Sequence, residues 1–337
     1  MNKNKNNIFE NAIKEFKNNI DLPITIYELE KDQQVKAADK KIKIELHDFE
    51  LIYNVVIKKV VNKAIVGQIK LKNKNLQHPN LIVTDYIAKE MAEKLKEKGI
   101  QFMDVAGNAY VNQFPLYIFI KGNKLKKKYK TPQPKRIFKT TGLRVLYNLL
   151  IKPELINRTY REIAEKLDVA LGTVGWLMKD LDNLGFLVRV EDGKRKIIFN
   201  KKILTDWCTN YPDNLKPKLH LGNYEFIKDN NNWQEFTKNN GLWGGEPAAA
   251  KMTDYLRPEI LTIYVDKKDL NKIIIDNRLN KEENGRIQFY EKFWDTTGNN
   301  KDTVNPLLVY ADLLATGNDR NIETAKIIYE QHLKHFE

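Results

Sequence analysis

The chain has 337 residues, 42% of them hydrophobic and 10% aromatic, so it is long enough for two or three domains and too apolar for general disorder. Its 57 lysines and arginines exceed its 44 aspartates and glutamates, and the formal net charge of +13 favours a polyanionic partner, above all nucleic acid. The single cysteine, Cys208, excludes an internal disulfide framework and a cysteine-cluster zinc site. No apolar run approaches the about 18–20 residues of a membrane span, and the polar start lacks a signal peptide's apolar region. We therefore expect a soluble, cytoplasmic protein with no membrane partner.

The first 122 residues are predicted to form an α/β domain. Hydrophobic periodicity predicts an amphipathic helix at 8–19, apolar β-rich runs at 24–29, 42–46, 49–61 and 65–71, a strand at 81–84, a helix at 86–98 and a strand at 101–104. The four β-rich runs together suggest a meander. This order of elements resembles the restriction-endonuclease-like fold.

That resemblance makes a metal-dependent nuclease the alternative function. Such a site needs an aspartate and a Glu/Asp-x-Lys pair at adjacent strand ends, which hold a divalent cation and activate water. Lys58 follows Val56 and Ile57, so it lacks the required carboxylate, and the nearby acidic residues lie around a turn instead. We therefore expect no metal site, no cofactor, no catalytic residue and no enzyme activity.

A short polar segment, Asp-Val-Ala-Gly-Asn-Ala, follows the strand at 101–104. Gly107 and Asn108 tolerate positive φ, and Asp104 can accept backbone N–H bonds across the loop, so a structural turn is predicted. The segment also resembles an Asp-x-x-Gly-Asn-Ala signature that is found next to winged helices in a group of bacterial antitoxin-like regulators.

The excess positive charge is concentrated in residues 121–139, which contain nine lysines and arginines and no acidic residue. Like charges repel one another, and Pro132 and Pro134 favour extended backbone, so a solvated linker is predicted at 123–139. A functional interpretation of the same segment is a basic arm that binds along DNA phosphates, with contacts from Lys126, Lys127 and Lys128.

Residues 140–208 begin with two predicted helices. The first occupies 141–151, with apolar residues at helical spacing, and stops before Pro153. The second occupies 159–167, where Thr159 and Glu162 form a capping box that satisfies backbone amides of the first turn. Small and apolar residues on one face of this helix would permit the close crossing of a helix-turn-helix.

A third helix is predicted at 173–184 and ends at Gly185. Its buried stripe would consist of Val174, Leu177, Met178, Leu181 and Leu184, which leaves Ala170, Gly172, Thr173, Gly175, Trp176 and Lys179 on the outward side. Residues 186–199 are then predicted to form a hairpin with a basic tip at 194–196.

Three helices and a basic hairpin in about 60 residues resemble the winged helix-turn-helix of bacterial regulators. Such a module places the N-terminal residues of its third helix in the DNA major groove. The expected DNA-contacting residues are therefore Thr159, Arg161, Ala170, Leu171, Thr173, Trp176, Lys179, Lys194, Arg195 and Lys196. Two alternatives stay open: a winged helix used only for protein contacts, and a Trp176 that packs against a neighbouring domain instead of DNA.

The remainder, 209–337, is predicted to be an α+β domain that begins with a connector at 209–222. Glu246 and Pro247 indicate a helix start with proline at the first helical position, 260–265 a strand, and Gly317 a turn between two helices. Asp312, Asp319 and Glu323 could suggest a metal site, but capping and turn roles explain them at least as well. The expected fold class is therefore α+β multidomain, with domains at 1–122, 140–208 and 209–337.

Two stretches of this last region carry a family resemblance. One begins Gly-Gly-Glu-Pro-Ala-Ala at residue 244 and continues with Tyr-Leu-Arg-Pro at 255 and Thr-Ile-Tyr-Val at 262. The other runs Asn-Pro-Leu-Leu-Val-Tyr-Ala-Asp-Leu from 305 and includes Thr-Gly at 316 and Arg-Asn-Ile-Glu-Thr-Ala from 320. With the segment at 104–109 and the helix pattern, the chain is similar over about residues 80–330 to the AbiEi family, transcriptional regulators that are antitoxins of type IV toxin–antitoxin systems.

The resemblance implies a DNA-binding autorepressor whose partners are double-stranded operator DNA and a nucleotidyltransferase toxin encoded beside it, without a stable antitoxin–toxin complex. Reading paired half-sites would require a homodimer, although no heptad repeat is present to form one. A further alternative is a protein-interaction module in phage defence, with the acidic last domain as its docking surface.

Overall fold

The computed structural model describes residues 3–30, 38–72, 77–125, 136–190, 194–227, 233–294 and 302–337. The chain mixes α and β structure and divides into two compact units, residues 1–133 and residues 134–337. The predicted boundaries at 122/123 and 139/140 enclose the observed division between the units. No division corresponds to the boundary predicted at 208/209.

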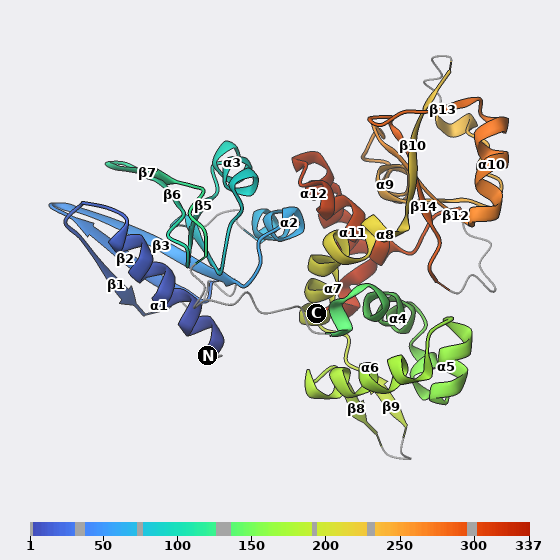
Figure 1. The fold of residues 1–337 in the computed structure, drawn as a ribbon, viewed down its shortest axis with the longest axis horizontal. Coiled ribbons are helices and arrows are strands. Elements are labelled where there is room, and N and C mark those ends of the chain that lie inside the picture. Colours follow the sequence, from blue (N-terminus) through green and yellow to red (C-terminus); the bar gives the residue numbers. More distant parts are fainter. Residues whose placement is uncertain are drawn as a thin grey trace. The chain divides into compact units, whose positions relative to one another are not determined.

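A seven-stranded sheet forms the centre of the first unit, and its strands lie side by side in sequence order (Figure 1). The strands are β1 (Ile24–Leu29), β2 (Lys40–Leu46), β3 (Phe49–Lys58), β4 (Asn80–Thr84), β5 (Gln101–Asp104), β6 (Ala109–Gln113) and β7 (Leu116–Ile120). The three central strands, β3 to β5, are parallel, whereas the pairs at both edges are antiparallel.

Helices cover both faces of this sheet (Figure 1). α1 (Lys3–Asn18) packs its apolar stripe, including Phe9 and Phe16, against one face. α2 (Lys63–Lys72) and α3 (Lys89–Glu97) pack against the other. The alternation along β3 fits this two-sided burial, because Tyr53 and Val55 belong to the first core and Val56 to the second.

The prediction of a β-rich run at 65–71 was wrong, because these residues belong to helix α2. Asn62 accepts a hydrogen bond from the backbone N–H of Ile65 (3.0 Å), which stabilises the first turn. Parallel neighbours such as β3 and β4 cannot be joined by a tight turn, so the segment between them must cross over the sheet as a helix. The hairpin of β6 and β7 was not predicted at all.

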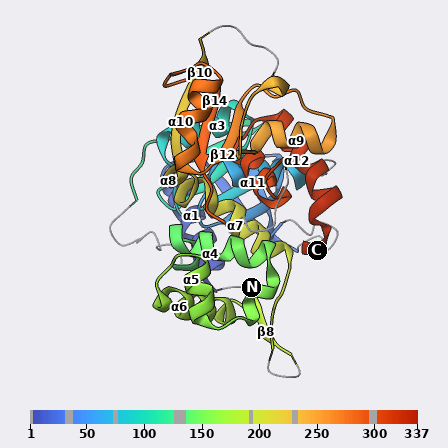
Figure 2. The same ribbon diagram turned by 90° about the vertical axis from the view of Figure 1, so that its right-hand side faces the viewer.

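The second unit begins with three helices and a two-stranded hairpin, which we call the helix–hairpin module, residues 136–197 (Figure 2). Its elements are a 3₁₀ turn at Arg136–Phe138, α4 (Thr140–Ile151), a 3₁₀ turn at Pro153–Asn157, α5 (Tyr160–Lys166), α6 (Leu171–Asn183), β8 (Leu187–Arg189) and β9 (Arg195–Ile197). The three predicted helices are therefore present within two residues of their expected bounds.

The rest of the second unit is a five-stranded sheet with helices around it. In chain order the elements are α7 (Lys201–Asn214), α8 (Lys216–Leu219), β10 (His220–Phe226), the 3₁₀ helix η4 (Trp233–Glu235), β11 (Leu242–Trp243), α9 (Gly245–Thr253), β12 (Leu261–Val265), α10 (Lys267–Asp276), β13 (Leu279–Lys281), β14 (Ile287–Glu291), α11 (Pro306–Thr316) and α12 (Asp319–Ile328), followed by a π turn at Tyr329–Leu333 and a 3₁₀ turn at Lys334–Phe336. The strand order is β11-β12-β14-β10-β13, and only β12 and β14 are parallel.

Helix α7 joins the helix–hairpin module to the following sheet region. The fully buried Trp207 donates its indole N–H to the carbonyl of Leu143 in α4 (3.0 Å), while Tyr211, one turn later, reaches Asp312 in α11 (3.0 Å). The connector predicted at 209–222 was therefore wrong. Its residues complete α7, despite the helix-internal Pro212, and then form α8 and β10.

Candidate nucleic-acid interface

The predicted capping box at the start of α5 is confirmed. The Thr159 hydroxyl accepts from the Glu162 N–H (3.2 Å), and the Glu162 carboxylate accepts from the Thr159 N–H (2.7 Å). The hydrogen bond that the Thr159 N–H donates to the carboxylate lowers the pKa of Glu162. Both side chains are exposed, as is that of Arg161 in the same turn. The box fixes the start of a helix of only seven residues, which packs Ile163 and Ala164 inward.

Replacing Thr159 with alanine should destabilise the second unit by about 1 kcal/mol, because the first turn of α5 then loses its side-chain acceptor. Urea unfolding followed by tryptophan fluorescence measures this, since all five tryptophans lie after residue 133. Thr159→Ser retains the acceptor and should stay within about 0.5 kcal/mol of the wild type. Equal losses in both variants would contradict a capping role.

Helix α6 has a buried face and an accessible one, largely as predicted. Val174, Leu177, Met178 and Leu181 are buried, whereas Leu184, just after the helix, is only half-buried. Of the predicted contact residues, Ala170, Leu171 and Lys179 are exposed, and Thr173 and Trp176 are half-buried. Leu171, at the first helical position, is 50% exposed, so this end of the helix presents apolar and small side chains to solvent.

The hairpin is shorter than predicted, and Arg195 and Lys196 lie in strand β9 instead of at a tip. Lys194 and Lys196 are exposed. Arg195 is half-buried, because its guanidinium donates to the carbonyl of Arg158 (2.9 Å) and lies over the ring of Tyr160 (5.2 Å). Arg195 therefore ties the hairpin to the start of α5, while the two lysines are available to a ligand. The predicted turn residues 191–193 lie outside the described residues.

Strand pairing places a further arginine beside this surface, which the sequence reasoning missed. Arg189 of β8 lies directly opposite Arg195, and Val188 lies opposite Lys196. Like charges at opposed positions of a hairpin repel one another unless an anion lies between or near them. Arg189 is exposed, so it adds a third accessible cation to the hairpin, on the face that Arg195 shares and opposite the face of Lys196. The signal is the register of the hairpin, which becomes available only when both strand bounds are known.

The basic run leading to the module falls mainly outside the described residues, and this includes Lys126, Lys127 and Lys128. At its described ends, Lys124, Arg136 and Lys139 are exposed, whereas Lys121 forms an ion pair with Glu93 of α3. The described part thus contributes cations on the module side through Arg136 and Lys139.

The turn predicted at 104–109 is confirmed, and it is saturated with internal hydrogen bonds. The Asp104 carboxylate accepts from the backbone N–H groups of Ile87, Ala106 and Asn108 (2.8–2.9 Å) and from the Asn108 side chain (2.8 Å). Burial raises the pKa of Asp104 to about 6, against the effect of these donors. Gly107 alone has the positive φ, 83°, that was expected of Gly107 and Asn108. The segment therefore fixes the end of β5, and the Asp104 carboxylate is engaged within the turn.

A buried charged cluster lies where α7, α8, β12 and α11 meet. Asp312, 1% exposed, accepts from Lys216 Nζ (2.7 Å), from Tyr211 Oη (3.0 Å) and from Tyr264 Oη (2.9 Å). Burial alone would lower the pKa of Lys216, but the charge of Asp312 raises it above its ordinary value. The capping or turn role predicted for Asp312 was therefore wrong: it is the acceptor of a buried ion pair.

The two stretches with the family resemblance meet at Glu246, which is buried. Its carboxylate accepts from the N–H groups of Glu259 (2.7 Å) and Ile260 (3.2 Å) and from the side chains of Asn321 (2.8 Å) and Arg320 (3.4 Å). Pro247 was predicted to be the first residue of this helix. Helix α9 begins at Gly245, so Pro247 is its third residue. The Gly-Gly-Glu-Pro residues thus join α9 to the start of β12 and to α12.

The described part of the chain contains no group of three or more histidines, cysteines, aspartates and glutamates arranged to hold a metal ion. Cys208 is fully buried, and burial raises the pKa of its thiol. Among the described helices, none is both long and apolar enough to cross a membrane.

Comparison with known proteins bears on the second unit. No curated protein and no solved structure matches the chain. A family model does match, over less than half of the chain, and the match begins in β9 and covers α7 to α12. Residues 196–334 are therefore similar to the AbiEi_2 family, described as "Transcriptional regulator, AbiEi antitoxin, Type IV TA system".

Proposed function

We propose that residues 140–200 form a winged helix-turn-helix and that the chain is a DNA-binding transcriptional autorepressor, the antitoxin of a type IV toxin–antitoxin or phage-defence system. The family match supports the regulatory and antitoxin role. The observation that carries DNA binding is the accessible face of α6 together with the cations of the hairpin, which adjoin the start of the matched region. Its alternative, a winged helix for protein contacts, would not need this gathering of cations.

In this proposal the residues divide into two kinds of contact. The N-terminal half of α6 enters a major groove, where Thr173, Trp176 and Lys179 meet base edges, with Ala170 and Leu171 as apolar neighbours. Phosphate contacts come from groups that are accessible around this helix: Thr159, Arg161, Lys194, Lys196, Arg189 and the basic run. Arg195 acts by positioning the hairpin, because its guanidinium is already engaged.

The proposed partners are double-stranded operator DNA and a nucleotidyltransferase toxin encoded by a neighbouring reading frame. We propose no enzyme activity. Lys58 lacks the preceding carboxylate of a nuclease motif, and the Asp104 carboxylate accepts hydrogen bonds within its own turn. Reading of paired half-sites by a homodimer remains part of the proposal.

Replacing Lys126, Lys127 and Lys128 with glutamine should weaken binding to the chain's own upstream DNA and to scrambled DNA by similar factors. Phosphate contacts release counterions whatever the sequence, so the slope of log affinity against log salt should become shallower by up to about 3. Mobility-shift titrations at several salt concentrations give both quantities. Glutamine at the exposed Lys268, Lys272 and Lys281 changes the charge equally and should leave the slope almost unchanged. An unchanged slope in the first variant would argue against a basic arm.

A further inference from the structure

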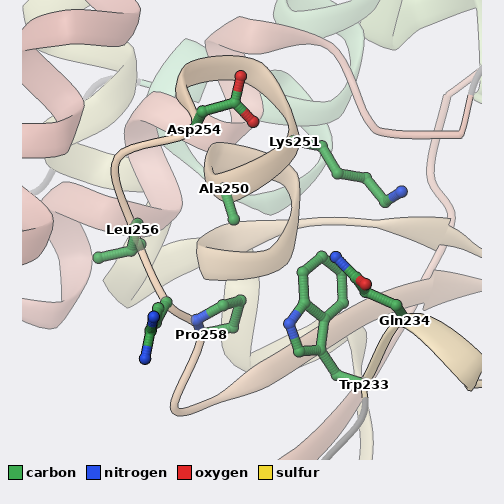
Figure 3. Close-up of a pocket in the computed structure, with 8 residues that line it drawn as sticks. Trp233, Gln234, Ala250, Lys251, Asp254, Leu256 and Pro258 are labelled. Carbon is green, nitrogen blue, oxygen red and sulfur yellow. The ribbon is translucent and has the colours of Figure 1, made fainter.

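A pocket of about 500 Å³ opens on the second unit (Figure 3), and none of its lining residues belongs to the helix–hairpin module. It lies between the last turns of α9, the segment that leads from α9 toward β12, and the 3₁₀ helix η4. The lining residues are Trp233, Gln234, Ala250, Lys251, Asp254, Leu256, Arg257 and Pro258. This volume is within the range of small-molecule sites, about 300–1,000 Å³.

One wall of the pocket is a fixed aromatic ring. Trp233 is half-buried and meets the buried Trp243 edge to face, with centroids 5.4 Å apart and ring planes at 86°. This contact holds the indole in one orientation. Ala250, Leu256 and Pro258 supply apolar surface opposite and beside it. The indole ring is therefore already ordered in the absence of a ligand. Its flat, apolar surface suits stacking against a planar ligand.

Two cations line the same space. Lys251 is anchored by an ion pair with Asp302 (3.0 Å) and lies 5.7 Å from the centroid of the Trp233 ring. Arg257 is exposed, and within the described ranges its guanidinium forms no ion pair. A guanidinium with free donors matches the geometry of a phosphate group, with which it can form two parallel hydrogen bonds.

The pocket also contains a carboxylate that the fold does not use. Asp254 lies across the pocket from Trp233 and Gln234 (Figure 3). It follows the last residue of α9, where the negative end of the helix dipole disfavours an acidic side chain. In the described part of the structure its carboxylate has no hydrogen-bond or ion-pair partner. The group is available to accept from N–H donors of a ligand.

We propose that this pocket binds a nucleobase that carries a phosphate group. The base stacks on Trp233, its amino or imino edge donates to Asp254, and the phosphate is bound by Arg257 with Lys251 contributing charge. An acidic peptide would match the cations but would leave the ring and Asp254 unused, and a nucleotide uses all three. The ligand is either a free mononucleotide or the end of an RNA strand. This site is separate from the DNA interface proposed above.

Isothermal titration of the full chain tests the proposal with AMP, GMP, CMP and UMP, the four corresponding nucleosides, and a tetranucleotide RNA with a terminal phosphate. At least one phosphorylated ligand should bind, and Arg257→Ala should weaken it at least about tenfold while leaving weak nucleoside binding unchanged. Asp254→Asn, which keeps a side chain that tolerates the left-handed backbone (φ 52°), should weaken ligands with a donating base edge. Lys272→Ala removes an exposed cation on α10 and should have no effect.

Tighter binding of the tetranucleotide than of any mononucleotide would support the RNA-end form, and the reverse order the free-nucleotide form. Absence of binding by all of these ligands at millimolar concentration would overturn the proposal, as would wild-type binding by Arg257→Ala, or a preference for an acidic peptide. Arg257→Ala should bind operator DNA like the wild type, so failure of this site is distinguishable from failure of the proposed DNA-binding function.

Discussion

Replacing Asp312 with asparagine is expected to destabilise the second unit by about 3 kcal/mol, at the lower end of the cost of breaking a buried pair, because the Lys216 ammonium, 18% exposed, is left without its counter-ion. The carboxylate is 1% exposed, and the two groups are 2.7 Å apart. The same oxygen atoms accept from two tyrosines, so the asparagine amide also faces hydroxyl groups that need acceptors. Urea unfolding followed by tryptophan fluorescence reports on this unit alone.

The double variant Asp312→Asn with Lys216→Met removes the orphaned charge and should recover part of the loss. Glu330→Gln breaks an exposed ion pair with Lys334 in the same unit and should cost less than about 1 kcal/mol. A cost below about 1 kcal/mol for Asp312→Asn would show that this cluster does not stabilise the packing of α7 and α8 against β12 and α11.

Substitution of Thr173 by valine together with Lys179 by alanine should lower affinity for the chain's own upstream DNA about 10- to 100-fold, because base-edge contacts are lost. Affinity for scrambled DNA should fall only a few-fold, since one cation is removed. The ratio of the two affinities, measured by mobility shift at one salt concentration, isolates the effect on specificity.

Asn183→Ala provides a matched control for this pair. Asn183 is exposed on the same side of α6 but lies in its last turn, away from the end that enters the groove. It should retain the wild-type ratio. If the double variant also retained that ratio, α6 would not be the helix that distinguishes one DNA sequence from another.

The elements that the sequence predicted best have local signals at their ends. Helix α5 begins with a capping box, and α6 ends before Gly185, which adopts a φ of 71°. These interactions join residues three or four positions apart, so they can be recognised without knowledge of the fold. The turn at Asp104 was predictable for the same reason, since its donors Ala106 and Asn108 are near in sequence.

Elements whose structure depends on distant pairing were predicted poorly. The apolar run that forms α2 is compatible with a strand or a helix. The parallel pairing of β3 and β4 requires a crossover connection between them, and this favours a helix. Helix α7 has an apolar stripe at helical spacing, Ile203, Leu204, Trp207 and Tyr211, but Pro212 suggested a connector. The buried stripe outweighs the single backbone bond that proline removes so near the helix end.

The candidate site shows the same division. Exposure of Lys179, Lys194 and Lys196 followed from the periodicity of α6 and the hairpin pattern. The engagement of Arg195 did not, because Arg158 and Tyr160, the partners of its guanidinium, lie 37 and 35 residues earlier in the chain. Asp312 is likewise paired with residues 96 and 101 positions away. Contacts of this separation leave no periodic signal, so side-chain roles that depend on them require the three-dimensional structure.

The proposed repressor function depends most on sequence-specific DNA binding by the helix–hairpin module. The most direct measurement is a mobility-shift titration of the full chain with its own upstream DNA and with a scrambled sequence of equal length and composition, at one moderate salt concentration. We predict that the upstream DNA binds at least about 10³-fold more tightly. Equal affinity for the two DNAs would contradict the proposed repressor function.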